Sequence, residues 1–150
     1  TINIKEKEYS SSWLEDDKYY FSDNDGAVIS EADPTQINSK DYPLIENRGD
    51  KLKLGNKINI KKEYVDYVFK LFNEIKTNRT NYQIDRFIFE KDYNTTIINL
   101  VDGPQLKFNI NNDVNEQLNR LEIFIKEKIK DNLKNTKYID LRYGDRVYYE

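Results

Sequence analysis

Two short acidic runs are the densest groups of potentially reactive side chains in this sequence, Glu15-Asp16-Asp17 and Asp23-Asn24-Asp25-Gly26. The second resembles part of a calcium loop, in which oxygens coordinate the ion and a glycine at the sixth position allows a sharp turn. With Gly26 at that position, Phe21 falls at the first position and Ala32 at the twelfth, and neither side chain supplies an oxygen. The run therefore predicts a turn between strands and no calcium site.

The sequence lacks several of the side chains and motifs that enzymes most often use for catalysis. The chain contains no histidine and no cysteine, which removes the commonest general base and the thiol nucleophile. It has no phosphate loop, no zinc-ligand spacing and no nucleophile elbow. Two isolated carboxylates could cleave a glycan, but nothing in the sequence pairs them. We therefore expect a protein that is not an enzyme and holds no metal or cofactor.

The composition is that of one folded domain with little charge bias. A chain of 150 residues can bury a core, and 13% aromatic residues oppose disorder. The balance of 24 basic and 27 acidic residues argues against a nucleic-acid partner, which would require a clustered basic face. There is no methionine and no apolar run of membrane-spanning length. We expect a piece of a longer protein, with any membrane anchor in the missing N-terminal part.

Hydrophobic periodicity predicts a series of strands and two helices. The expected strands cover residues 2–9, 18–22, 27–30, 84–90, 95–101 and 105–110. Apolar residues at helical spacing predict helices over 61–76 and 111–133, each with one apolar face. The apolar face of each helix must be buried, and the sheet needs cover. We therefore expect an α+β fold, with an antiparallel-dominated mixed sheet and two amphipathic helices packed against it.

Two segments of the sequence predict irregular structure. Residues 10–13 are expected to form a loop. Residues 31–60 hold several breakers and predict a long connection with one short strand at 51–54. The apolar side chains expected to dock this connection are Tyr42, Leu44 and Ile45.

The second helix has a start signal and a surface ion pair. Asn112 or Asp113 can cap its first turn. Glu116 and Arg120 are spaced to form an i,i+4 pair, which favours a helix by about 0.2–0.5 kcal/mol.

The C-terminal run predicts a strand, a tight turn at Gly144-Asp145 and a final strand from Arg146 to Tyr149. Alternation places Ile139, Leu141 and Tyr143 on one face of the first strand. The final strand has no sequence after it to pair with, so it is expected at a sheet edge. An exposed edge is a template for a partner's strand.

The same run carries a family resemblance. Asp140-Leu141-Arg142-Tyr143 is similar to the terminal signature of the bacterial cell-division proteins FtsQ/DivIB. Earlier segments resemble the family's motifs in the same order, namely Ile2 to Lys7 with Trp13, Tyr19 to Ile29, and Tyr42-Pro43-Leu44-Ile45. The resemblance implies that residues 1–9 are a remnant of the last POTRA strand and that residues 10–150 are the family's β domain.

The resemblance also implies a function. The family is a non-enzymatic divisome scaffold with a single membrane helix, its folded part on the outer side of the cytoplasmic membrane, and a location at the division septum. It binds the FtsB/DivIC and FtsL partners and helps to regulate septal peptidoglycan synthesis. A partner strand is added to the terminal strand, and the corresponding residues here are Tyr143, Arg146, Val147, Tyr148 and Tyr149. Proline at Tyr148 is expected to abolish such binding by removing a ladder donor.

A second function stays open from the residues alone. The chain has twelve tyrosines, and amphipathic rings suit partly buried surfaces. Together with the acidic runs, they also suit an envelope surface module that binds cell-wall polymer or carbohydrate.

Overall fold

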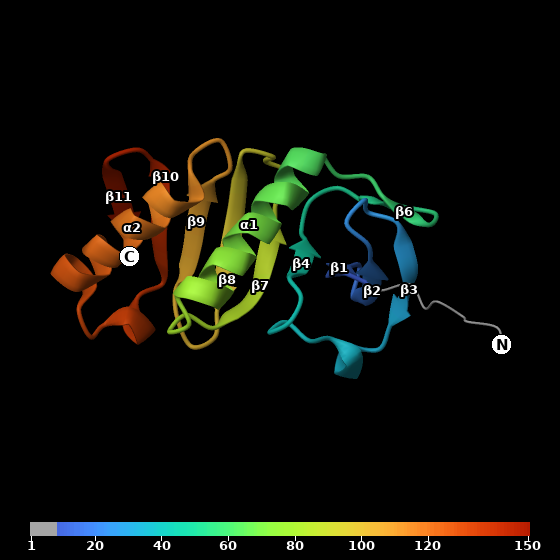
Figure 1. Ribbon diagram of the computed structural model, residues 1–150, viewed down its shortest axis with the longest axis horizontal. Helices are drawn as coiled ribbons and strands as arrows, with labels where there is room; N and C mark the ends of the chain where they lie inside the picture. The colour runs from blue at the N-terminus through green and yellow to red at the C-terminus, as the bar shows by residue number, and fades with distance from the viewer. Residues whose placement is uncertain (1–8) are drawn as a thin grey trace.

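A nine-stranded sheet is the framework of the molecule (Figure 1). The computed structural model describes residues 9–150, so the strand predicted over 2–9 lies outside the described residues except for Tyr9. From edge to edge the strand order is β11-β10-β9-β8-β7-β4-β1-β2-β3. The strands are β1 Ser11–Glu15, β2 Lys18–Ser22, β3 Val28–Ala32, β4 Leu44–Asn47, β7 Ile84–Phe89, β8 Thr95–Leu100, β9 Gln105–Asn109, β10 Tyr138–Tyr143 and β11 Arg146–Tyr149.

The sheet is mixed, with antiparallel pairs in the majority. Parallel pairing joins β1 to β4, β4 to β7 and β9 to β10. The other neighbouring strands pair antiparallel. A separate small hairpin consists of β5 Lys53–Leu54 and β6 Lys57–Ile58. With the two helices described next, this arrangement confirms the predicted α+β class.

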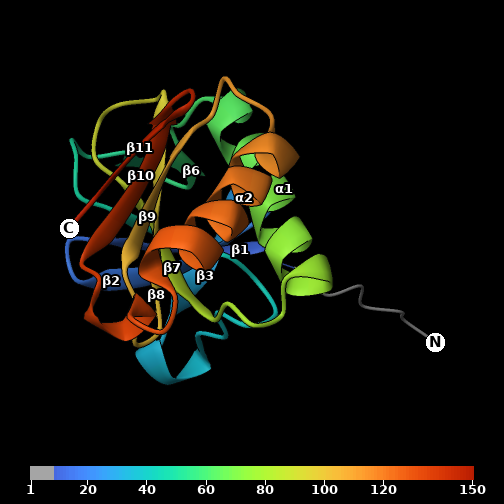
Figure 2. The same cartoon turned by 90° about the vertical axis from the view of Figure 1, so that its left-hand side faces the viewer.

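Both α-helices of the described residues cover the same face of the sheet (Figure 2). Helix α1 spans Lys62–Asn78, and α2 spans Val114–Phe124 and continues into a π-helical turn at Ile125–Ile129. The spacing predicts an apolar stripe on α1, and most of it is buried, except that Phe69 is only partly buried and Tyr67 is buried in addition. The buried residues are Tyr64, Val65, Tyr67, Val68, Leu71, Phe72 and Ile75. Each large side chain buried in this way contributes about 1.5–3 kcal/mol before chain entropy is counted.

A buried glutamine joins α2 to the rest of the core. Asp113 caps the helix by accepting from the Glu116 N–H, as predicted. One turn further on, the Gln117 side chain accepts from the Asn109 N–H at 2.9 Å and donates to the Tyr67 hydroxyl at 2.7 Å. Gln117 has no exposed surface. It therefore satisfies polar groups from α1 and from the end of β9 where water cannot reach them.

Two predictions of irregular structure are wrong. Residues 10–13 were expected to form a loop, but Ser11 begins β1, which pairs with β2 on one side and β4 on the other. The Ser11 and Ser22 hydroxyls share a buried hydrogen bond of 2.7 Å, and this bond satisfies two small polar side chains in the interior.

The connection over residues 31–60 likewise contains a central strand, β4, beside a short 3-10 turn at Pro34–Gln36 and the β5–β6 hairpin. Leu44 and Ile45 are buried as expected, but they are buried as part of the sheet. Tyr42 contacts the Tyr9 ring, and the strand expected at 51–54 is reduced to β5.

The end of the second helix also differs from the prediction. The π-helical turn closes with a hydrogen bond from the Lys130 N–H to the Ile125 carbonyl, and Lys130 has φ +54°. This left-handed residue stops the helix before Leu133, which begins a separate 3-10 turn, Leu133–Asn135. Among the described residues, Glu116 and Arg120 form no ion pair; Arg120 reaches the Leu141 carbonyl instead.

Replacing Gln117 with leucine is expected to lower the free energy of unfolding by about 2–3 kcal/mol, because the Asn109 N–H and the Tyr67 hydroxyl lose a buried partner. Urea denaturation followed by circular dichroism measures this change. The matched control is Asn115→Leu on the exposed side of the same helix, with an expected change within about 0.5 kcal/mol. Equal effects for the two variants would contradict the role given to Gln117.

Candidate functional site

The terminal hairpin lies at one end of the sheet. Among the described residues, β11 pairs with β10 alone, so its other side is open. Tyr143 pairs with Arg146 across the two-residue turn, and Gly144 adopts φ +60° while Asp145 does not. A left-handed glycine at the first turn position matches the predicted tight turn. The structure thus places the final strand at an edge, as expected.

The hydrogen-bond pattern shows which backbone groups of β11 face outward. Glu150 and Tyr138 exchange both backbone hydrogen bonds, so the polar groups of Glu150 point toward β10. Antiparallel strands alternate the direction of these groups residue by residue. The backbone N–H and C=O groups of Tyr148 and Arg146 therefore also point toward β10, whereas those of Val147 and Tyr149 lie at the open edge.

A β-bulge in β10 sets the face on which Tyr143 lies. Asp140 pairs with Tyr148 and Tyr143 pairs with Arg146, so β10 has one residue more than β11 between these pairs. Such an extra residue reverses the alternation that follows it. Tyr143 consequently contacts the Tyr148 ring edge-on, with a centroid distance of 5.6 Å. The prediction that Tyr143 shares a face with Ile139 and Leu141 is wrong, because those two side chains lie in the core.

The outer face of the hairpin forms an open depression that is rich in rings and cations. Two cations lie over ring faces, Arg142 over Tyr143 at 5.1 Å and Lys107 over Tyr138 at 4.9 Å. The depression is lined by Lys107, Tyr138, Asp140, Arg142, Tyr143, Arg146 and Tyr148. This surface suits acidic and aromatic side chains of a partner, through ion pairing and ring contacts.

An ion pair forms the floor of this depression. Arg142 donates from Nε to Asp140 Oδ1 at 2.9 Å and from Nη2 to Oδ2 at 2.7 Å, a two-point geometry. The Arg142 N–H also donates to Asp140 Oδ1. Burial raises the pKa of Asp140, but the hydrogen bonds from Arg142 and the charges of Arg142 and Lys107 outweigh it and hold the pKa below its usual value.

The inner side of β11 is apolar. Val147 is half-buried against the core, and the Tyr149 ring meets Phe124 of α2 edge-on at a centroid distance of 5.0 Å. Even so, Tyr143, Tyr148 and Tyr149 are 54%, 47% and 52% exposed. Three large rings half in water, on one strand pair with an open edge, mark a surface that a partner can cover.

The structure thus gathers all five predicted partner-binding residues on one hairpin. Sequence reasoning missed Lys107 and Tyr138 as members of the same depression. Lys107 comes from β9 and is brought there by the parallel pairing of β9 with β10, which no local pattern encodes.

The acidic runs have structural roles. Glu15 is buried and accepts from the Leu52 N–H at 2.6 Å and from the Lys53 N–H at 3.1 Å, which ties the β5 segment to β1. Asp23 accepts from the N–H groups of Asp25 and Ala27 inside the β2–β3 turn. Within residues 9–150, no group of three or more carboxylate, histidine or cysteine side chains is placed to hold a metal ion.

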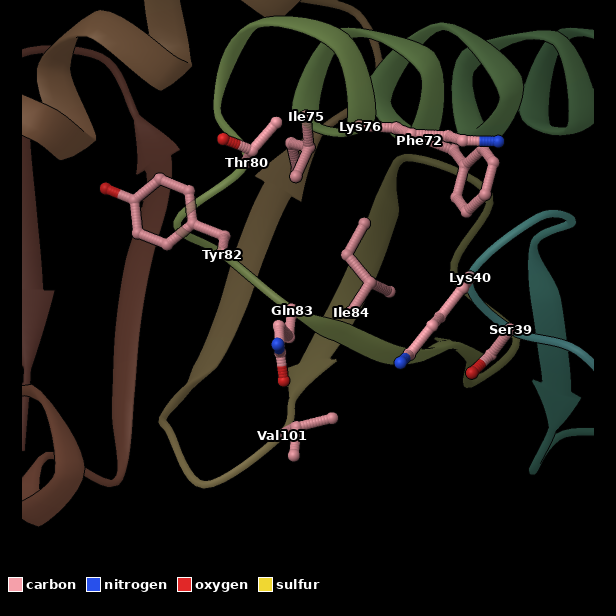
Figure 3. A pocket seen from close by; sticks show the side chains of 10 residues that line it. All are labelled: Ser39, Lys40, Phe72, Ile75, Lys76, Thr80, Tyr82, Gln83, Ile84 and Val101. Carbon is pink, nitrogen blue, oxygen red and sulfur yellow. The ribbon is translucent and has the colours of Figure 1, made fainter.

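A separate cavity of about 270 Å³ lies beside the C-terminal half of α1 (Figure 3). Phe72, Ile75 and Ile84 form its apolar part, and Lys40 and Lys76 lie at its rim. It has no carboxylate or histidine in its lining and is remote from the terminal hairpin in the strand order.

Fold and site together define an α+β module in which, within residues 9–150, the terminal strand β11 lies at an edge of the sheet. The chain matches the family described as cell division protein FtsQ/DivIB, C-terminal, over residues 12–142. It belongs to that family, which is one of non-enzymatic cell-division scaffolds with protein partners in the divisome. A comparison with curated proteins finds no match. No helix of residues 9–150 is both long and apolar enough to cross a membrane.

Replacing Asp140 with asparagine is expected to lower the free energy of unfolding at pH 7. Because the folded-state pKa of Asp140 lies below its unfolded value of about 3.9, the stabilisation is present above that pH and is lost as the pH falls through the folded-state pKa. Urea denaturation of both proteins from pH 7 to pH 2 tests this, with exposed Asp131→Asn as control. A difference that stays constant down to pH 2 would refute the assignment.

Proposed function

We propose that this chain is the partner-binding β domain of a divisome scaffold on the outer side of the cytoplasmic membrane. In this proposal the full protein is anchored by a single membrane helix and concentrates at the division septum. Residues 10–150 form the β domain, and residues 1–9 end a preceding POTRA domain. The domain binds FtsB/DivIC-like and FtsL-like proteins and helps to regulate septal peptidoglycan synthesis.

The observation that carries the proposal is the open edge of β11. Its outward N–H and C=O groups, on Val147 and Tyr149, can pair with an extended partner segment. Side chains of an added strand would alternate between two surroundings. One side meets the cationic and aromatic depression, and the other meets Phe124 and Tyr149. A partner strand that alternates acidic and apolar residues fits both faces.

The backbone pattern changes the choice of test residue. Tyr148→Pro, expected from the sequence to abolish binding, would remove an N–H that faces β10 and would damage the hairpin itself. Val147→Pro removes an N–H that faces the open edge. Proline is tolerated on the outward side of an edge strand, so the fold should survive.

Val147→Pro is expected to weaken binding of the membrane-proximal extracellular segment of the organism's FtsB/DivIC-like protein by at least about tenfold. This corresponds to about 1.4 kcal/mol, because one neutral backbone hydrogen bond to the added strand is lost and the adjacent ones are weakened. Calorimetry at constant salt measures the affinity. Val147→Ala is the matched control, because it removes the side chain and keeps the N–H. A folded Val147→Pro variant with the parent's affinity would exclude strand addition at β11.

The second function, binding of wall polymer, is favoured by the half-buried ring of Tyr138 and the exposed ring of Tyr143, each beside a cation. Aromatic faces of this kind can stack on sugars. Co-sedimentation with purified peptidoglycan distinguishes the two functions. If Tyr138→Ala abolishes co-sedimentation while Val147→Pro leaves it intact, the domain binds polymer through its outer face. If the parent protein stays in the supernatant, the polymer hypothesis fails.

A further inference from the structure

Arg120 makes an unusual contact beneath the terminal hairpin. It projects from α2 and donates from Nη2 to the Leu141 carbonyl at 3.3 Å. Parallel pairing between β9 and β10 ends at Asp140 and Lys107, so Leu141 lies just beyond the last strand pair on that side. The guanidinium therefore replaces a missing ladder partner at the point where the β10 register shifts.

This contact is costly for the fold. Among the described residues, Nε and Nη1 of Arg120 are buried and have no hydrogen-bond partner. Each unpaired buried donor opposes folding, and a cation with unpaired donors does so more strongly. The exposed Glu116, one turn away on the same helix, forms no ion pair with it. Core stability alone would favour an apolar residue at this position.

We infer that Arg120 is a positioning residue that holds the bulge of β10. With the bulge in place, Arg142 and Tyr143 both lie on the outer face, where Tyr143 meets Tyr148. Without it, regular alternation would turn Tyr143 to the inner face beside Leu141. Arg120 thus determines which face of the hairpin presents Tyr143. The consequence for partner binding rests on the function proposed above.

Two variants and a control separate this role from a purely structural one. Arg120→Leu removes the donor and the unpaired nitrogens, and Arg120→Lys keeps one charged donor. Glu116→Gln changes charge on the same helix without touching the hairpin. For each protein we would record ring-to-ring nuclear Overhauser effects between Tyr143 and Tyr148, the thermal unfolding midpoint, and the calorimetric affinity for the FtsB/DivIC-like segment.

Arg120→Leu is expected to keep an unfolding midpoint within about 4 °C of the parent. It should lose the Tyr143–Tyr148 effects and bind the segment at least about tenfold more weakly, whereas Arg120→Lys and Glu116→Gln retain both properties. Persistence of the ring contacts in Arg120→Leu would overturn the inference. A large fall in the midpoint with the ring contacts retained would show a structural role only, and would also overturn it.

The two proposals fail separately. If the parent protein does not bind the segment, strand addition to this partner fails, while the ring contacts still decide the role of Arg120. Should Arg120→Leu not fold, Arg120→Met, which is unbranched and has no hydrogen-bond donor, supplies the same ring-contact measurement.

Discussion

The parallel pairing of β10 with β9 is the constraint from which the functional half of this molecule follows. Parallel neighbouring strands cannot be joined by a tight turn. A crossover must therefore carry the chain from the C-terminal end of β9 back to the level at which β10 begins. Helix α2 is that crossover, and it also covers the inner face of the last strands. Once β10 has entered beside β9, the strand joined to it by a hairpin can only lie outside it. The edge position of β11 is therefore a result of topology.

Buried polar groups mark the places where elements must meet in one way. Gln117 links α2 to α1 and β9, the Tyr64 hydroxyl reaches Thr96 at 3.1 Å, and Glu15 fixes the β5 segment. Each of these groups is satisfied, so each adds specificity without a large desolvation penalty. Arg120 differs from these groups, because two of its buried donors are unpaired, as are the buried hydroxyls of Ser10 and Ser12. Departures of this kind from full satisfaction are expected where a fold serves binding as well as stability.

The sequence predicts the parts of this fold that have strong local patterns. The stripe of α1, the Asp113 cap and the terminal hairpin all follow from spacing and turn chemistry. Strand β1 has a serine-rich start, and its burial depends on a hydroxyl partner in β2, so no apolar alternation reveals it. Strand β4 is four residues long and follows Pro43, and it is a strand because β1 and β7 flank it. The site residues were predictable as a run, but the face of Tyr143 was not, because a bulge leaves no mark on a period-two pattern.

The two ends of the sheet are built differently. At the far end, the start of β3 is occupied by the β5–β6 hairpin, through hydrogen bonds from Val28 N–H to the Asn56 carbonyl and from Ile58 N–H to the Gly26 carbonyl. Pro34 follows β3 directly after Asp33 and cannot donate to a further ladder. If strand addition at β11 is the mode of binding, as proposed, the domain resembles a chain terminator in a polymerisation: one partner segment joins at β11, and the covered start of β3 opposes extension of the sheet by a second copy. Such an association tends to stop at a defined stoichiometry instead of growing into a fibre.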